Sequence, residues 1–315
     1  MRKALLLHAA ARAALAAPAT AFSRAPAARG FRASTARRLN RIMLEPAEAT
    51  FADGVCTAVV GAADPRSKHV RGVLKAASGG AVRAGVVDTC RDDAAAVAWR
   101  DDGAMELTLR VGDGAAAVAR SPVSLLLALP RPLQMARLLP TIAQMGVGSI
   151  VVHGASKVEP NYFGGHLLRA ERGAERRALL VEGLSQSGDV ALPPLDVRKK
   201  LWKFLDDELD AMYPPDAYRR VVAHPHRAGE PPAARMRNLA PPSGGGTGIL
   251  LSVGPEGGWT DEELEGLRRR GFVQVALAGE RVLRTDVAVV ALLAQAHDRV
   301  EEWEEMEAGG GLQSS

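Results

Sequence analysis

The sequence has 315 residues, of which 47% are hydrophobic and 4% aromatic, and a formal net charge of +4 at pH 7. This length allows one large domain or two modest ones, and no run of 18 apolar residues predicts a transmembrane helix, so we expect no membrane partner. The charge alone does not indicate a nucleic-acid partner. Residues 1–44 contain nine Lys and Arg and no Asp or Glu, and the remaining chain has 31 basic against 36 acidic residues.

Residues 1–39 are rich in Ala, Arg and Ser, and this composition is typical of an organellar transit peptide. Arg29-Gly-Phe31, followed by Ser34 and Arg37-Arg38, resembles a mitochondrial processing region. The alternative is a plastid transit peptide cleaved within Ala19–Phe22, and a third possibility is a disordered tail with no targeting function. We expect a mitochondrial protein, with the plastid as the alternative.

Residues 40–118 show short apolar segments separated by turn signals such as Asp53-Gly54 and Gly79-Gly80. The predicted strands are Val55–Val60, Ala81–Val87, Ala95–Trp99 and Met105–Val111. This succession of short strands and turns predicts a small β-barrel domain. Cys56 and Cys90 are too few for a four-cysteine zinc site and lack the Cys-x-x-Cys spacing, so we expect no metal.

Residues 119–303 alternate strands with helices, which predicts an α/β domain with a mainly parallel sheet covered on both faces. The predicted strands are Val123–Leu129, Ser149–Val152, Val221–Ala223, Ile249–Val253 and Val273–Leu277. The predicted helices are Leu133–Met145, Gly165–Leu184, Val197–Met212, Asp261–Arg270 and Thr285–Glu302. We expect Gly229–Gly248, rich in Pro, Gly and Ser, to be a flexible insertion, and 304–315 to be a disordered tail.

A glycine-rich turn at Gly254–Gly258 follows the predicted strand Ile249–Val253. Thr260 and Glu263 have the spacing of a capping box, which fixes the start of the next helix. Glycines allow the backbone to approach a ligand closely, and N–H groups at a helix start can receive a carboxylate. An ordinary strand-to-helix turn is the alternative interpretation.

A second segment, Gly279–Asp286, lies between a predicted strand and the last helix, with Thr285 as a candidate N-cap. It carries Arg281 and Arg284 at the carboxyl end of a strand, where open α/β sheets bind ligands. The alternative is a solvated basic turn.

Taken together, the two segments resemble the closing motifs of the RsmE-type 16S rRNA uridine-N3 methyltransferases of the SPOUT superfamily, which carry an IGPEGG turn and a GxRILRTET segment in this order. Asn40–Leu44, His69–Lys75 and Met145–Val147 are similar to further family segments, so the resemblance covers nearly all of 40–303. It implies a PUA-like RNA-binding barrel at 40–118 and a SPOUT methyltransferase domain with a trefoil knot at 119–303. It also implies a homodimer, S-adenosyl-L-methionine as cofactor, and a uridine of small-subunit ribosomal RNA as substrate.

The resemblance assigns cofactor contacts to three loops. These residues are His224 and Pro225; Gly254, Glu256 and Gly257; and Gly279, Val282, Leu283 and Arg284. Because the cofactor methyl is already activated, positioning carries much of the catalysis and no metal is required. Arg281 or Arg284 is expected to stabilise charge on the uracil oxygens, and Glu256 or Asp286 is the candidate base.

Several positions depart from the family pattern. Two segments lack charged residues of the family: Ser185–Asp189 lacks the Glu and Arg of an EQSGR-like stretch, and Ser156–Glu159 lacks a nearby Arg. In two other places a residue is exchanged: Lys75 replaces an Arg, and Asp286-Val287 replaces Glu-Thr. All but the change at Asp286 are expected on the substrate side. Alternatives are therefore a SPOUT methyltransferase acting on a different RNA, or a non-catalytic ribosome-assembly factor. A nucleotide-binding enzyme is disfavoured because no Lys-Ser/Thr follows the glycines.

Overall fold

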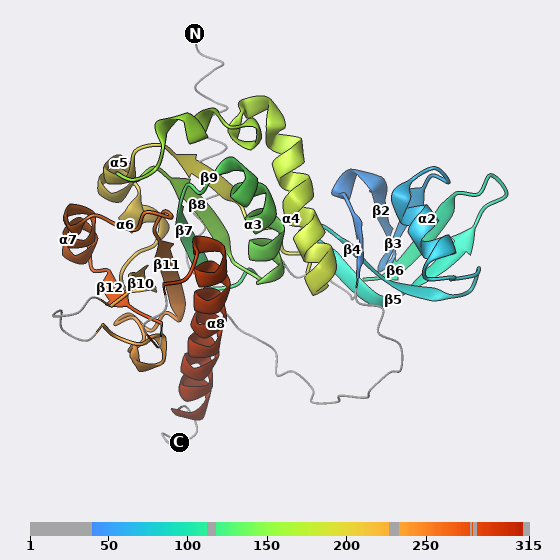
Figure 1. Ribbon diagram of the computed structural model, residues 1–315. Coiled ribbons are helices and arrows are strands. Elements are labelled where there is room, and N and C mark those ends of the chain that lie inside the picture. The colour runs from blue at the N-terminus through green and yellow to red at the C-terminus, as the bar shows by residue number, and fades with distance from the viewer. Residues whose placement is uncertain (1–39, 112–117, 227–232, 278, 280–281, 311–315) are drawn as a thin grey trace, which may run out of the picture.

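The computed structural model describes residues 40–111, 118–226, 233–277, 279 and 282–310. The predicted transit peptide, 1–39, and Arg281 lie outside these ranges. Two sheets organise the chain, one in each half (Figure 1).

The first sheet forms a curled, open half-barrel of six strands in the order β1-β4-β5-β6-β3-β2. Its strands are β1 (Ile42–Leu44), β2 (Ala49–Ala52), β3 (Val55–Val60), β4 (Ala81–Val86), β5 (Cys90–Trp99) and β6 (Met105–Arg110). Only the β1–β4 pair is parallel. The Asp53-Gly54 turn between β2 and β3 has positive φ at both residues, which is the geometry that favours a two-residue hairpin.

Strands β1 and β2, helix α2 and the first half of β5 were not predicted. Helix α2 (Pro65–Gly72) follows β3, and Asp64 caps it by accepting a hydrogen bond from the Arg66 amide. Strand β5 begins at Cys90, five residues before the predicted start. That early part carries charged residues and is mostly exposed, so its sequence lacks the apolar alternation of a half-buried strand.

The second sheet has six parallel strands in the order β12-β10-β11-β7-β8-β9. They are β7 (Val123–Ala128), β8 (Ser149–His153), β9 (Leu195–Arg198), β10 (Tyr218–Ala223), β11 (Gly248–Val253) and β12 (Val273–Val275). The central strands β7 and β11 are buried at every residue, as expected for strands covered on both faces.

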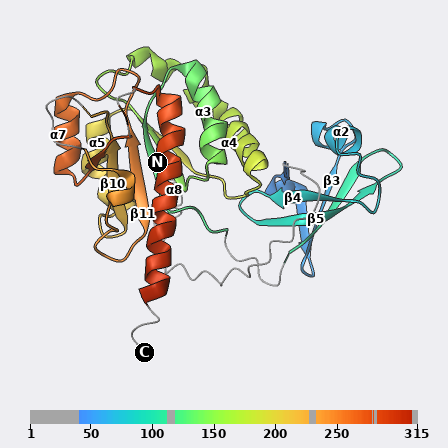
Figure 2. The same ribbon diagram turned by 60° about the horizontal axis from the view of Figure 1, so that its bottom comes forward.

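Helices cover both faces of this sheet, as Figures 1 and 2 show. On one face lie α3 (Pro132–Gln144), α4 (Gly173–Ser187) and α8 (Thr285–Gly310), and on the other lie α5 (Leu201–Asp207), α6 (Leu209–Met212) and α7 (Asp261–Arg269). The prediction of a parallel sheet between two helical layers is confirmed. Among the described residues, no helix has the length and apolarity needed to cross a bilayer.

Three predicted elements were placed wrongly. The helix expected at Gly165–Leu184 is preceded by 3-10 turns at Pro160–Gly164, His166–Leu168 and Ala170–Arg172, and α4 begins only at Gly173. Arg176 donates to the carbonyl oxygens of Leu167 and Arg169, which holds these turns outside the helix.

The helix expected at Val197–Met212 instead divides into β9, α5 and α6, with a break at Glu208, whose carboxylate binds Arg198 at 3.0 Å. The third error concerns the last helix, which does not stop at Glu302 but continues to Gly310, so part of the predicted tail 304–315 is helical. Trp303 explains the extension, because its ring is buried and its Nε1 donates to the Leu239 carbonyl oxygen.

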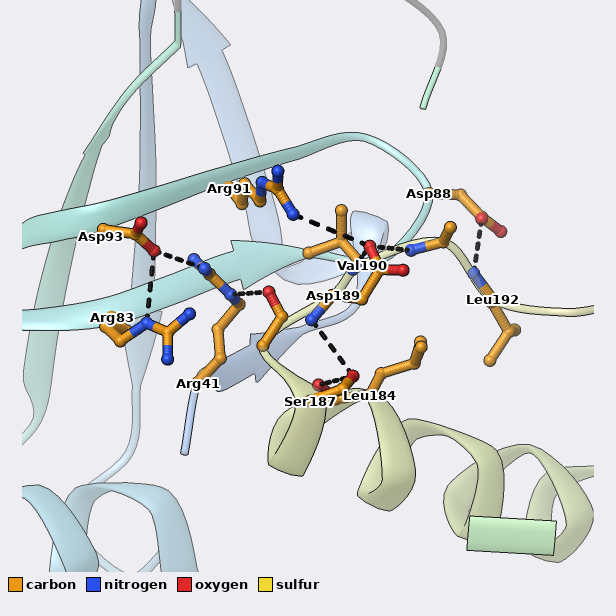
Figure 3. A network of polar contacts seen from close by, with 12 residues as sticks. Arg41, Arg83, Asp88, Arg91, Asp93, Leu184, Ser187, Asp189, Val190 and Leu192 are labelled. Atoms are coloured by element: carbon orange, nitrogen blue, oxygen red, sulfur yellow. Dashed lines mark hydrogen bonds and ion pairs between the residues drawn. The ribbon is translucent and has the colours of Figure 1, made fainter. Parts of the chain in front are cut away.

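The half-barrel is joined to the parallel domain through the end of α4 (Figure 3). Arg41 is 1% exposed and donates to the carbonyl oxygens of Ala84 at 2.7 Å and Gly188 at 2.8 Å. Its backbone exchanges hydrogen bonds with Ser185, and its guanidinium pairs with Asp93. Ser185–Asp189, expected on the substrate side, therefore forms a junction between the domains.

Candidate active site

A cavity of about 790 Å³ opens above the carboxyl ends of β7, β10, β11 and β12. It is lined by the segments that leave these four strands, namely Pro130–Leu138, Ala223–His226, Val253–Trp259 and Val275–Leu292, each contributing several residues. The chain leaves β7 toward β8, whereas β10, β11 and β12 lie on the other side of β7. Ligands bind at such a reversal of strand order in open α/β sheets.

The glycine-rich turn forms one wall of the cavity. Gly258 has φ of 70°, and its amide donates to the Pro255 carbonyl oxygen at 2.8 Å, closing a tight turn. A Cβ at Gly254 would lie 3.0 Å from the Trp259 ring, a tight contact that favours glycine there. The predicted capping box is confirmed, because Thr260 and Glu263 each bind the other's backbone amide.

Glu256 joins two walls of the cavity. Its Oε1 accepts a hydrogen bond at 3.2 Å from the amide of Arg131, the N-cap residue of α3. A carboxylate at a helix N-terminus satisfies a free amide and interacts favourably with the helix dipole. In this arrangement Glu256 holds the glycine-rich turn against α3.

The second predicted loop forms the opposite wall. Gly279, Val282, Leu283 and Arg284 all line the cavity, and Gly279 has φ of 91°. The Arg284 guanidinium donates to Asp286 at 2.9 Å, while 74% of its side chain is exposed. The Arg284 carbonyl accepts the first helical hydrogen bond of α8, so Arg284 occupies the position predicted for Thr285.

His224 and Pro225 line the cavity as predicted, directly after β10. The His224 amide donates to the Val275 carbonyl oxygen at 3.0 Å, which ties the ends of β10 and β12 together. The structure therefore brings every described residue of the three predicted loops to one cavity.

The segment after β8 contacts the glycine-rich turn from behind, which was not predicted. Lys157 donates from Nζ to the carbonyl oxygens of Gly257 at 3.0 Å and Trp259 at 3.4 Å. The Ser156 amide donates to the buried carboxylate of Glu263 at 2.7 Å. The segment Ser156–Glu159, expected on the substrate side, therefore contacts the glycine-rich turn.

His153 lies beneath this segment. Its ring stacks on Trp259, with centroids 5.8 Å apart and planes 9° from parallel. Complete burial lowers the pKa of His153 to about 4, so the ring is neutral near pH 7. His153 therefore supports the floor of the turn as an uncharged packing group.

Comparison with known proteins agrees with this fold. A family model described as an RNA methyltransferase domain matches residues 118–297. The ribosomal RNA small subunit methyltransferase E of Treponema pallidum is 25% identical over 253 residues, which cover 76% of this chain and 86% of that protein.

Solved structures are similar over most of the chain. One is the crystal structure of a ribosomal RNA small subunit methyltransferase E from Neisseria gonorrhoeae bound to S-adenosyl methionine. Its TM-score is 0.60 at 21% identity, and the match covers 81% of this chain and 95% of that one. A methyltransferase from Legionella pneumophila, in complex with SAM, gives a TM-score of 0.55 at 19% identity, covering 82% and 98% of the two chains.

The parallel domain thus has a SPOUT-like fold with a ligand cavity above four strand ends. The chain belongs to the RNA methyltransferase family whose model spans 118–297, which confirms the resemblance to RsmE-type enzymes carried by its two closing motifs.

Proposed function

We propose that this chain uses S-adenosyl-L-methionine to methylate N3 of a uridine in small-subunit ribosomal RNA. The main support for this proposal is that described residues of both motif loops, Gly254–Gly258 and Gly279–Asp286, line one cavity. Two relatives support the cofactor and substrate class by name, one a small-subunit rRNA methyltransferase and the other a structure bound to S-adenosyl methionine.

The cavity fits a cofactor of this kind. Its volume of about 790 Å³ falls within the range typical of small-molecule sites. Leu138, Val253 and Leu277 offer an apolar wall for a flat base, and the glycine-rich turn offers backbone polar groups. When bound, the cofactor supplies an activated methyl group, so the protein's task is to orient the acceptor.

Arg284 is the proposed group for the acceptor base. It lies at the cavity with most of its guanidinium exposed, and Asp286 fixes one of its nitrogens. Its remaining N–H groups can stabilise negative charge on the uracil oxygens as the N3 proton leaves. Asp286 and Glu256 both line the cavity and are the two candidate bases for that proton.

Methyl transfer from labelled cofactor to small-subunit rRNA, followed by mapping of the modified base, tests this function. N3-methyluridine at one position supports the proposal, and a label on another base or another RNA supports the alternative target. Absence of transfer by a protein that binds the cofactor would support a non-catalytic assembly factor. At saturating cofactor, Arg284→Ala should lose turnover, whereas unchanged turnover would remove Arg284 from the mechanism.

We also propose that the enzyme is a homodimer. Leu133, Val282, Leu283, Val287 and Val290 are apolar and exposed at the starts of α3 and α8, with Leu133 78% and Val282 81% accessible. Clustered apolar exposure of this kind marks an interaction surface. Val290→Asp should shift the mass measured by light scattering from dimer to monomer. Met306→Asp, at the other end of α8, is the matched control and should leave the mass unchanged.

The acid-free composition of residues 1–39 supports import into mitochondria, with plastids as the alternative. A fluorescent protein fused after residue 39 should reach one of these organelles. Diffuse fluorescence would refute the organellar assignment.

A further inference from the structure

The segment from Ala234 to Leu239 is attached to β12, the strand before the second cavity loop, and to the later part of α8, the helix after it. At its start, Ala234 pairs with Val275 beside β12, through an amide that donates to Gln274 at 3.2 Å and a carbonyl that accepts from Ala276 at 3.1 Å. This part of the predicted flexible insertion, Gly229–Gly248, is therefore anchored to the sheet.

Arg235 forms hydrogen bonds with the residues that follow β12. Its Nη1 donates to the carbonyl oxygen of Ala276 at 2.8 Å and also to that of Leu277. Both acceptor residues line the cavity, and the loop toward Gly279 follows them directly. Hydrogen bonds from a charged donor are stronger than neutral ones, and the half-buried site limits competition from water.

The other end of the segment is fixed to α8. Met236 begins a 3-10 turn and is 1% exposed. The Leu239 carbonyl oxygen then accepts hydrogen bonds from Arg299 Nε at 2.8 Å and Trp303 Nε1 at 3.3 Å. The segment thus links the strand before the loop to the helix after it.

We propose that Arg235 is a positioning residue that presets the exit of β12, at Ala276 and Leu277, for cofactor binding. The identity of the ligand rests on the proposed function, whereas the effect on the exit of β12 does not. Without Arg235, the carbonyl groups of Ala276 and Leu277 lose their shared donor, and this part of the cavity wall samples other conformations. The apparent affinity of a ligand falls in proportion to the population of the competent conformation.

The test compares Arg235→Met with Arg237→Met, which removes an exposed arginine two positions further along the same turn. Amide hydrogen exchange is measured on the ligand-free protein in the peptide Ala276–Thr285, and the Kd for S-adenosylmethionine by calorimetry. For Arg235→Met we expect exchange roughly tenfold faster and a Kd roughly tenfold higher. Arg237→Met should match the wild type in both.

Arg235→Lys, which keeps the charge and one donor group, should fall between the two. If Arg235→Met does not fold, the comparison of Arg235→Lys with Arg237→Met decides, and equal exchange rates would overturn the proposal. Unchanged exchange in Arg235→Met overturns it as well. If the wild type fails to bind the cofactor, the proposed function is wrong, and the exchange data still decide the role of Arg235.

Discussion

Lys157→Met tests whether the loop after β8 holds the glycine-rich turn in its binding conformation. Methionine keeps a long apolar stem beside Gly257 and removes only the ammonium group. The lost contacts are the hydrogen bonds to the carbonyl oxygens of Gly257 at 3.0 Å and Trp259 at 3.4 Å. The Ser156–Glu263 hydrogen bond and the capping box remain, so the turn should loosen without unfolding.

The size of the effect follows from these contacts. A hydrogen bond from a charged group contributes about 1.5–3 kcal/mol when well formed and shielded. Lys157 is exposed and its second contact is long, so water replaces part of the interaction. We therefore expect a loss of about 1 kcal/mol, which corresponds to roughly a fivefold higher Kd for the cofactor.

Calorimetry with S-adenosylmethionine measures this difference directly. Lys200→Met is the matched control, because Lys200 is an exposed lysine on the loop after β9, outside the cavity lining. Equal affinities for Lys157→Met and wild type would refute the view that this lysine organises the turn. A parallel loss in Lys200→Met would instead indicate a general effect of charge.

Three further predictions concern stability and reactivity. Burial depresses the pKa of His153 to about 4, so the neutral ring contributes its full stability above the unfolded pKa of 6.5, and this stability is lost as the pH falls toward 4. Denaturant titrations should show a decrease of about 3 kcal/mol in the free energy of unfolding over this pH range, and His153→Gln should not show this decrease. Arg41→Ala leaves buried carbonyl groups at the domain junction without a donor, and it should lower the free energy of unfolding measured in urea by about 3 kcal/mol. A change below about 0.5 kcal/mol, which is typical of substitutions at surface sites, would show that these contacts do not stabilise the junction. Burial and the neighbouring Cys90 raise the pKa of the Cys56 thiol to about 11, so iodoacetamide at pH 8 should modify Cys56 roughly a hundredfold more slowly in the native than in the unfolded protein, and equal rates would contradict its buried placement.

The sequence predicted those parts of the fold whose cause is local. Val123–Leu129 and Ile249–Val253 are mostly apolar segments of strand length, which favours strands covered on both faces, and the Thr260–Glu263 pair marks a helix start by itself. That the two motif loops share a site was predicted from their resemblance to the closing motifs of RsmE-type enzymes, and their position after strands of a parallel sheet agrees with it.

The errors arose where distant contacts decide local structure. The contact between Glu208 and Arg198 accompanies a break in a pattern that is helical in sequence, and the packing of Trp303 extends α8 through a run of glutamates. Lys157 and Arg235 lie outside the two closing motifs and act through backbone carbonyl groups, which carry no sequence signature.

The central claim is that the turn after β11 and the loop after β12 together bind one molecule of S-adenosylmethionine. Hydrogen exchange of the protein with and without the cofactor tests it most directly. The account predicts slower exchange in both Val253–Trp259 and Ala276–Ala288 at one cofactor per chain. Protection of only one of these segments, or of a surface elsewhere, would contradict it.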